Sequence, residues 1–206
     1  MKPNEKVRKT TFKSFHKGDG LSIFDIDETL LRTFAKVLVR DKMSGKIVQK
    51  LSNTEYNSHE LQPGHEYDYT QFGDAKLFRS TSKPIRELLE RIKYVIRVID
   101  DAGARDSKVI LLTARGKFDD HDEFMDTFKD HGIDTGKIDV ITAGSASAKK
   151  KHIDDLLSTG KFTRVRMYDD HAPNLTDFLS LKDKYSNIHF RAYIVKNGKM
   201  EIYKEI

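Results

Sequence analysis

The second half of the chain alternates short apolar segments with longer segments in which apolar residues recur at helical spacing. Helical segments end near glycines, as at Gly103, Gly132 and Gly160. Short strands that alternate with helices of ~10–15 residues predict βαβ units, and therefore an α/β fold with a Rossmann-like parallel sheet covered by helices on both faces. In order, the expected elements are a helix at 82–103, a strand at 109–112, a helix at 122–131, a strand at 138–141, a helix at 147–157, a strand at 165–168, a helix at 173–184, and strands at 189–195 and 200–203 joined by an Asn197-Gly198 turn.

The first half of the chain adds one buried strand and an insertion. The apolar run at 21–24 enters a cluster of acids and predicts the first strand of the sheet. Residues 36–51 predict a β-hairpin that turns at Ser44-Gly45, whereas the polar segment 52–82 is expected to be irregular. The expected organisation is a basic extension at 1–20, then a core at 21–206 with a small hairpin-and-loop insertion at about 34–82.

Polar residues follow four of the expected strands, at the edge of the sheet where the carboxyl ends of parallel strands meet. Taken alone, an Asp or a Thr after a strand is most often a helix cap. Polar residues at all four strand ends favour a ligand-binding site instead, because ligands of such sheets bind at this edge. The residues are Asp25, Asp27 and Thr29 after the first strand, Thr113 and Arg115 after the second, Lys149 beyond the third, and Asp169 and Asp170 after the fourth.

The acids among these residues predict a metal site. Two carboxylates ~4 Å apart repel by about 4 kcal/mol at an effective dielectric constant of ~20, so a cation or a proton must lie between them. The chain contains no cysteine, and a site made only of oxygen ligands selects a hard ion, Mg²⁺ first. Because Mg²⁺ also binds phosphate oxygens, and a lysine ammonium and a threonine hydroxyl neutralise phosphate further, the pattern predicts phosphate chemistry.

The same residues resemble the haloacid dehalogenase superfamily of phosphatases. The segment Phe24-Asp25-Ile26-Asp27-Glu28-Thr29-Leu30 is similar to its first motif, DxDxT, and the apolar strand that ends in Thr113 is similar to its second. Lys149 is placed like the lysine of the third motif, and Met167-Tyr168-Asp169-Asp170 resembles the acidic pair of the fourth. The segments that carry the motifs, about 21–33 and 108–178, cover over a third of the chain.

The resemblance implies roles for residues of the first two motifs. Asp25 would be the nucleophile that forms an aspartyl-phosphate, and it would also bind Mg²⁺. Asp27 would be the general acid for the leaving alcohol and then the base that activates water, with its backbone carbonyl on the metal. Thr113 would donate a hydrogen bond to the phosphoryl group. Thr29 and Arg115 would bind substrate, although pairing with a local acid is an equal expectation for Arg115.

The fourth motif completes the expected metal site. By the resemblance, Asp170 would be a ligand of Mg²⁺ and Asp169 would support it. Variants of the family carry a further Asp four residues on, where this chain has Asn174, so the role of Asn174 stays open.

The lysine of the third motif has two candidates at the start of one helix. Lys149 precedes Ile153 by four residues and Leu156 by seven, so it lies on the side of the helix that those apolar residues bury. We therefore expect Lys149 to reach the site, with Lys150 as the alternative.

The insertion bears on the choice of substrate. In the resembled family such insertions cap the site, and an insertion at about 34–82 implies a small cap and an open site. An open site suits larger substrates such as nucleotides or nucleic-acid ends. The resemblance thus implies a Mg²⁺-dependent phosphomonoester hydrolase that acts on a nucleotide or a nucleic-acid terminal phosphate, with a phosphorylated small molecule as a further expected partner. The net charge of +5 favours anionic partners, but it equally describes a generic basic surface. The polar segment of the insertion is in many such proteins only a solvated loop that a few aromatic residues stabilise. If it instead contacts the substrate, the residues expected to contact a base or a sugar are His59, His65, Tyr67, Tyr69 and Arg79.

Two other functions remain as alternatives. A receiver-type signalling domain uses similar residues, but it places the acid pair before the phosphorylated Asp, whereas here the DxDxT segment comes first. A nucleic-acid-binding module with a vestigial site would bind with salt-dependent affinity and show no metal-dependent turnover. The intact pair of Asp25 and Asp27 argues against the second alternative.

The composition excludes several classes of protein. The absence of cysteine rules out disulfides, thiolate metal sites and cysteine nucleophiles. The sequence contains no run of ~18 apolar residues, so neither a membrane span nor a membrane partner is expected. The first 18 residues lack the apolar core of a secretory signal. We therefore expect a cytoplasmic protein.

Overall fold

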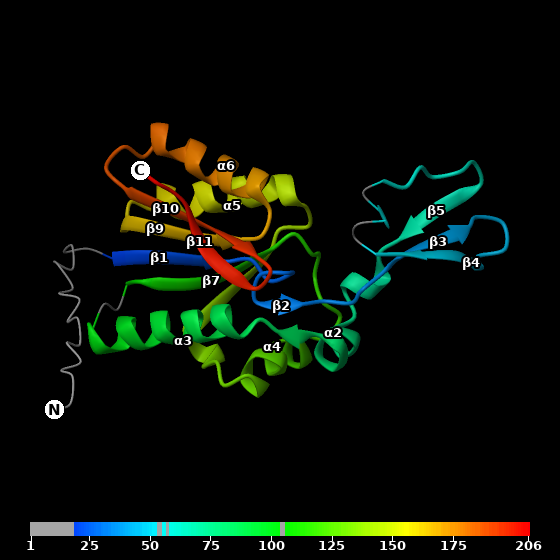
Figure 1. Cartoon of the computed structure of the whole chain (residues 1–206), viewed down its shortest axis with the longest axis horizontal. Helices are drawn as coiled ribbons and strands as arrows, with labels where there is room; N and C mark the ends of the chain where they lie inside the picture. Colours follow the sequence, from blue (N-terminus) through cyan, green and yellow to red (C-terminus); the bar gives the residue numbers. More distant parts are fainter. Residues whose placement is uncertain (1–18, 53–54, 57, 104–105) are drawn as a thin grey trace, which may run out of the picture.

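The protein is built on a six-stranded sheet in which five strands run parallel and one edge strand is antiparallel. The computed structural model describes residues 19–206 except 53–54, 57 and 104–105. Helices cover both faces of the sheet (Figure 1), which confirms the predicted α/β class. The strands of the sheet are β1 (Asp19–Phe24), β7 (Lys108–Thr113), β8 (Ile138–Thr142), β9 (Phe162–Asp169), β10 (His189–Lys196) and β11 (Lys199–Glu205).

The two helical layers bury alternate residues of the strands. In β1, Leu21 and Ile23 pack in the cluster that contains residues of α5 (Ala146–Ser158) and α6 (Ala172–Ser180). Phe24 packs in the other cluster, with residues of α3 (Arg86–Asp101) and α4 (His121–Asp130). Successive side chains of a strand point to opposite faces, and here both faces are buried. That is why these strands read as continuous apolar runs in the sequence.

The strand order places a topological switch beside β1. The order is β11-β10-β9-β1-β7-β8. Numbering the parallel strands along the chain gives the order 3-2-1-4-5 of Rossmann-type sheets. The chain moves from β1 to β7 and β8 in one direction and then crosses to β9 on the other side of β1. Sheets of this kind bind ligands at that switch point, outside the carboxyl ends of the strands.

The last two strands form the hairpin that the Asn-Gly pair predicts. β10 and β11 pair antiparallel, and Asn197 and Gly198 between them have φ angles of 53° and 77°. Positive φ at both central residues is the geometry that favours Asn-Gly in two-residue turns.

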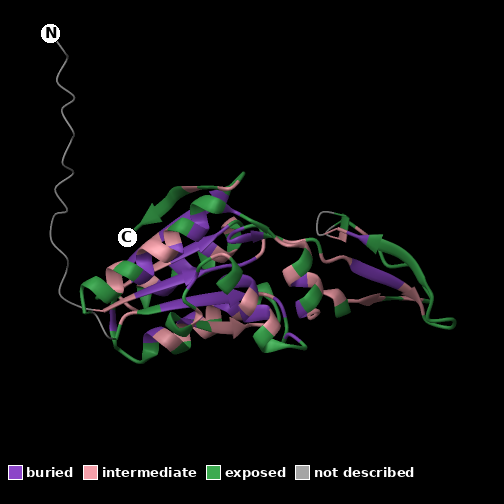
Figure 2. Cartoon of the chain, turned by 90° about the horizontal axis from the view of Figure 1, so that it is seen from below, coloured by how far each residue is buried: buried purple, intermediate pink, exposed green. Residues whose placement is uncertain are grey.

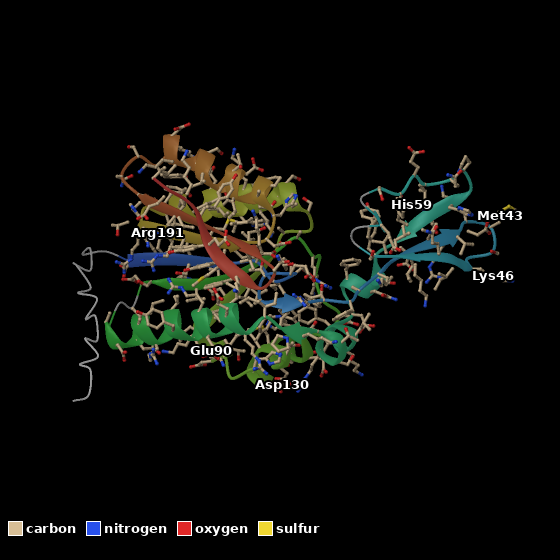
Figure 3. The ribbon with its side chains drawn as sticks, in the orientation of Figure 1. Met43, Lys46, His59, Glu90, Asp130 and Arg191 are labelled. Atoms are coloured by element: carbon tan, nitrogen blue, oxygen red, sulfur yellow. The ribbon has the colours of Figure 1, made fainter. Side chains whose placement is uncertain are left out.

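The insertion forms a second sheet with a small core of its own. Its strands are β3 (Val37–Asp41), β4 (Ile47–Leu51) and β5 (His65–Asp68), in the order β4-β3-β5, so the predicted hairpin is confirmed. Val37, Val39 and Leu51 are buried together inside it. This sheet projects away from the main sheet, and much of its outer surface is exposed (Figures 1 and 2). Met43 and Lys46 lie at its far end (Figure 3).

The prediction that residues 52–82 are irregular is wrong in two places. β5 pairs with β3, and α2 (Ala75–Thr81) follows a short 3-10 helix at Thr70–Phe72. β5 reads HEYD and has no apolar periodicity, so it forms because β3 offers an edge to pair with rather than from intrinsic preference. α2 does have a local signal, since the Asp74 side chain accepts a hydrogen bond from the Leu77 amide and caps the helix.

The helix predicted from residue 82 begins about one turn later. Lys83–Pro84 form the short strand β6, which pairs with β2 (Leu31–Arg32). The Ile85 amide then donates a hydrogen bond to the Leu30 carbonyl. α3 therefore starts only at Arg86, after this pairing ends. A proline is tolerated in such a two-residue pair because it lies at a sheet edge.

The N-terminal extension predicted at 1–20 is described only at its last two residues. Of the basic extension expected at 1–20, residues 1–18 lie outside the described residues, and Asp19 and Gly20 belong to β1. None of the described helices combines the length and the apolar composition that a membrane span requires.

Candidate functional site

Asp25 and Asp169 lie side by side at the switch point. Phe24 at the end of β1 is opposite Tyr168 of β9, and the Asp25 amide continues this pairing with a 2.9 Å hydrogen bond to the Tyr168 carbonyl. The rings of Phe24, Tyr168 and Tyr193 stack in series, with centroids 4.3 and 4.6 Å apart. This stack joins β1, β9 and β10 directly beneath the site, so the two carboxylates are positioned by packed strands rather than by loops.

Lys149 joins the two carboxylates. Its Nζ lies 2.6 Å from Asp25 Oδ1 and 3.0 Å from Asp169 Oδ2, and the side chains of all three residues are at most 6% exposed. Lys149 lies in the first turns of α5, whose N-terminus is capped by the Ser145 hydroxyl. Lys151 instead pairs with Asp155 at the surface. The structure thus brings Lys149 to the predicted site, as its spacing from the apolar residues of α5 indicates.

Asp170 completes a group of three carboxylates. One oxygen each of Asp25, Asp169 and Asp170 lies within 4.8 Å of the others. Three carboxylates against the single ammonium of Lys149 leave two negative charges, which one divalent cation would balance. All donors of the group are oxygens, so its chemistry fits Mg²⁺.

The shortage of positive charge also affects the acidity of the group. Burial raises the pKa of Asp25 well above its ordinary value, and Asp169 and Asp27 add to this effect while Lys149 opposes it. Desolvation, with the negative charge of Asp169, raises the pKa of Asp170 to about 6. Burial lowers the pKa of Lys149, but the two carboxylates raise it by more. The lysine therefore stays charged.

Asn174 orients Asp169. Its Nδ2 lies 3.0 Å from both carboxylate oxygens of Asp169, and the His171 amide donates a 2.8 Å hydrogen bond to Asp169 Oδ1. An aspartate at this position would have no amide hydrogens to donate. The role left open in the sequence is therefore that of a hydrogen-bond donor to an acid of the cluster.

Asp27 is held apart from this cluster by Arg115. Two guanidinium nitrogens of Arg115 contact the Asp27 carboxylate, with a shortest distance of 2.7 Å. Thr33 Oγ1 donates to Asp27 Oδ1 at 2.5 Å, and Thr113 Oγ1 donates to Oδ2 at 3.4 Å. Burial alone would raise the pKa of Asp27, but the charge and hydrogen bonds of Arg115 and the hydrogen bond of Thr33 lower it below its ordinary value. Asp27 is therefore ionised at neutral pH.

Arg115 pairs with a local acid, the second of its two expected roles. Its side chain is 2% exposed and is surrounded by the rings of Phe72, Phe78 and Phe118, with its guanidinium carbon 5.0 to 5.8 Å from their centroids. It also donates a 3.0 Å hydrogen bond to the Phe72 carbonyl. Arg115 thus connects Asp27 to the insertion.

Thr29 and Thr113 are both buried. Thr113 Oγ1 accepts a 3.1 Å hydrogen bond from the Arg115 amide in addition to its contact with Asp27. The hydroxyl of Thr29 is buried, and no hydrogen-bond partner for it lies among the described residues. The loop that carries Thr29 turns through Glu28, which has a φ of 54°, a conformation uncommon for a residue with a side chain.

A cavity of about 620 Å³ opens beside Asp27, between the insertion and the strand ends. The insertion contributes Tyr56, Tyr69 and Phe72 to its lining. The core contributes Asp27, Arg115 and a group of small residues that comprises Ala114, Gly116, Gly144, Ser145 and Ala146.

Of the five insertion residues predicted to contact a base or a sugar, Tyr69 alone is in the lining of this cavity. The His59 ring is hydrogen-bonded to the Tyr67 hydroxyl at 2.9 Å, and Arg79 forms ion pairs with acids of α4, including Asp130 at 2.8 Å. The sequence reasoning missed Tyr56 and Phe72. The aromatic composition of the segment was a signal for both, but it does not say which rings face the core.

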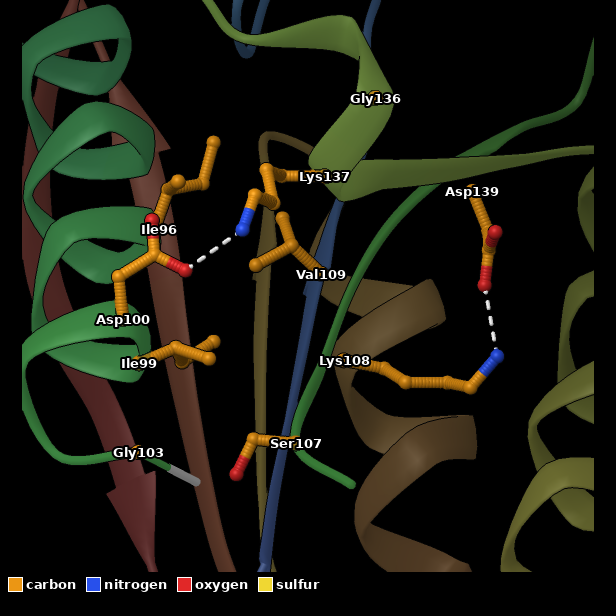
Figure 4. Close-up of a pocket in the computed structure, with 10 residues that line it drawn as sticks. All are labelled: Ile96, Ile99, Asp100, Gly103, Ser107, Lys108, Val109, Gly136, Lys137 and Asp139. Carbon is orange, nitrogen blue, oxygen red and sulfur yellow. Dashed lines mark hydrogen bonds and ion pairs between the residues drawn. The ribbon is translucent and has the colours of Figure 1, made fainter. Parts of the chain in front are cut away.

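A second cavity, of about 560 Å³, lies at the opposite end of the sheet (Figure 4). Its charged residues neutralise one another, because Lys137 pairs with Asp100 at 2.9 Å and Lys108 pairs with Asp139 at 2.8 Å. It lies at the amino ends of β7 and β8, away from the acidic cluster.

No protein-family model, curated protein or solved structure matches the chain in the three comparisons.

Proposed function

We propose that this chain is a Mg²⁺-dependent phosphomonoester hydrolase in which Asp25 attacks phosphorus. One observation carries the proposal: the Lys149 ammonium lies within 3.0 Å of both Asp25 and Asp169 at the switch point of the sheet, with Asp170 beside them. A carboxylate nucleophile, a fixed ammonium and two more carboxylates are the parts that a phosphoryl transfer to Asp needs.

The expected metal ligands are Asp25, Asp169 and Asp170, with the backbone carbonyl of Asp27 as the resemblance implies. When bound, Mg²⁺ would supply positive charge to these carboxylates and to the phosphoryl oxygens. The ionised form of Asp25, which is the nucleophilic form, is then favoured despite its burial. The Lys149 ammonium offsets part of the negative charge of the phosphoryl group.

The proposed reaction has two steps. In the first, an oxygen of Asp25 forms a bond to phosphorus, the bond between phosphorus and the leaving oxygen breaks, and the leaving oxygen takes a proton from Asp27. In the second, water attacks phosphorus, Asp27 accepts its proton, and the bond between Asp25 and phosphorus breaks to release phosphate. Asp27 is then protonated again for the next first step.

The environment of Asp27 fits one half of this cycle better than the other. Its pKa is lowered mainly by Arg115, so the ionised form, which accepts a proton from water, is favoured. The acid role requires Asp27 to retain the proton from the second step, and the guanidinium contact works against that. We therefore assign Asp27 first of all the role of base in hydrolysis of the aspartyl-phosphate.

We also propose that the insertion serves as a small cap of the kind found in the haloacid dehalogenase superfamily, which the four motifs resemble. The hydrogen bond from Arg115 to the Phe72 carbonyl, and the cavity between the insertion and Asp27, support this role. The substrate class is a phosphorylated small molecule, a nucleotide or the terminal phosphate of a nucleic acid.

The two alternatives are less well supported. Receiver-type domains have the flavodoxin-like strand order 2-1-3-4-5, whereas this sheet has the order 3-2-1-4-5. A module with a vestigial site has no need of the buried contact between Lys149 and Asp25, which costs desolvation of both groups.

The test is a screen of phosphomonoesters with Mg²⁺ and with a chelator, on the wild type and on Asp25→Asn. We expect Mg²⁺-dependent phosphate release that Asp25→Asn abolishes without altering the circular dichroism spectrum. Asp177→Asn, an exposed acid on α6, is the matched control and should keep full activity. Turnover by Asp25→Asn would refute the mechanism.

A further inference from the structure

The cavity beside Asp27 lies on the side of the site where the leaving group must be. Its lining includes Asp27 but none of Asp25, Lys149, Asp169 and Asp170, which surround the expected position of phosphorus. In the proposed reaction the leaving oxygen faces Asp27. The group attached to that oxygen therefore extends into this cavity.

The two walls of the cavity have different chemistry. On the insertion side they are aromatic, with Tyr56, Tyr69 and Phe72. On the core side they consist largely of glycine, alanine and serine, and a Cβ added at Gly116 or Gly144 would meet no atom within 4 Å. A cavity with aromatic rings and such open space suits a flat, unsaturated group that stacks on a ring.

Hydrogen bonds fix the tyrosines and leave polar atoms at the wall. The hydroxyls of Tyr56 and Tyr69 are 2.7 Å apart, and the two rings meet edge to face with centroids 5.8 Å apart. Tyr69 remains 47% exposed, so it is accessible to a ligand. Burial and the hydrogen bond to Tyr56 raise the pKa of Tyr69 to about 12, which keeps its hydroxyl neutral. A neutral hydroxyl both donates and accepts hydrogen bonds.

The polar atoms favour a nucleobase over a simple aryl group. The paired hydroxyls of Tyr56 and Tyr69 still offer a donor and acceptors to a ligand whose rim carries both, as the edge of a base does. A phenyl ring, as in phosphotyrosine, has no such groups to satisfy. The cavity volume of about 620 Å³ also leaves room for a sugar between the base and Asp27.

We propose that this cavity binds the nucleobase of a nucleotide substrate, with the base stacked on the Tyr69 ring and the perpendicular Tyr56 ring at its edge. The two rings would then select nucleotides over aliphatic phosphomonoesters. This inference rests on the proposed hydrolase function for the orientation of the substrate.

The test compares two substrates in matched variants. We measure kcat/KM for adenosine monophosphate, with the phosphate on either end of the ribose, and for glycerol phosphate. Tyr69→Leu and Tyr56→Leu are each expected to lower the value for adenosine monophosphate about tenfold, mainly through KM, as loss of one aromatic contact to a base does. Glycerol phosphate, which has no base, should change less than about twofold. Tyr203→Leu, an exposed tyrosine on β11, should change neither.

Three results would overturn the inference. Equal losses for both substrates mean that the tyrosines have only a structural role, and unchanged values for both mean that they do not contact the substrate. A wild type that prefers phosphotyrosine to adenosine monophosphate reassigns the cavity to an aryl phosphate.

Binding of unphosphorylated adenosine, measured by calorimetry, separates this inference from the proposed function. If no phosphomonoester is hydrolysed, the hydrolase function fails, and the cavity is judged by this measurement alone. Adenosine should bind to the wild type, and its affinity for the Tyr69→Leu variant should be about tenfold lower. No detectable binding to the wild type would refute the nucleobase site.

Discussion

Lys149 neutralises only part of the negative charge at the strand ends. It contacts Asp25 and Asp169, while Asp170 lies within the same group of carboxylates. Breaking a buried ion pair by removing one partner leaves an uncompensated charge and is costly, whereas removing a lysine in better contact with solvent costs much less. The two neighbouring lysines of α5 therefore offer a direct comparison.

We predict that Lys149→Met lowers the free energy of unfolding by about 3 kcal/mol in the presence of a chelator. Lys150→Met, one residue further along the same helix and less buried, should change it by no more than about 0.5 kcal/mol. Urea unfolding at neutral pH measures both. Equal effects of the two substitutions would contradict the placement of Lys149 between the carboxylates.

At the scale of single elements, the sequence predicted the main sheet and its strand ends closely. β1, β7, β9 and β10 each lie where the sequence has an apolar run, because both of their faces are covered. β8 also lies where an apolar run predicts it, although as an edge strand it buries only Ile138. The side of α5 that carries Lys149 followed from helical spacing alone.

Elements that depend on a distant partner were not predictable in the same way. β5 has no apolar pattern and exists because of its pairing with β3. The start of α3 is delayed because Lys83–Pro84 pair with Leu31–Arg32. The contact between Arg115 and Asp27 joins residues 88 positions apart, so no local pattern separates it from the alternative of a substrate contact.

The insertion should open more readily than the main sheet. The core cluster of its sheet contains three buried aliphatic side chains, Val37, Val39 and Leu51, while β1 and β9 are packed between two helical layers. Amides open with a free energy that reflects this local burial. We predict by hydrogen-exchange mass spectrometry that β3 and β4 exchange well before β1 and β9. Equal protection of the two sheets would show that the insertion and the core unfold as one unit.

At the scale of the whole molecule, the acidic cluster links stability to pH and to Mg²⁺. The pKa of Asp170 in the folded protein is about 6, above its ordinary value of 3.8. Between pH 3.8 and about pH 6 the metal-free folded protein therefore binds more protons than the unfolded chain. The stability that protonated Asp170 contributes is fully present below pH 3.8, and it is lost as the pH rises through about 6. The raised pKa of Asp25 acts in the same direction.

We therefore predict that Mg²⁺ raises the melting temperature more at about pH 8 than at about pH 5. At the higher pH the carboxylates of the cluster are ionised and repel one another, whereas at the lower pH protons compete with the metal for these carboxylates. Scanning calorimetry with millimolar Mg²⁺ and with a chelator measures the difference. A shift that is absent at both pH values, or larger at the lower one, would contradict a cation site at Asp25, Asp169 and Asp170.

The central claim is that Asp25 becomes phosphorylated during turnover. The most direct measurement is to quench the reaction of the wild type with substrate and Mg²⁺, reduce the protein with borohydride, and map it by mass spectrometry, because borohydride converts an aspartyl-phosphate to homoserine. The account predicts homoserine at position 25, dependent on both substrate and Mg²⁺. A phosphoryl group trapped at another residue, or steady turnover with Asp25 never modified, would contradict it.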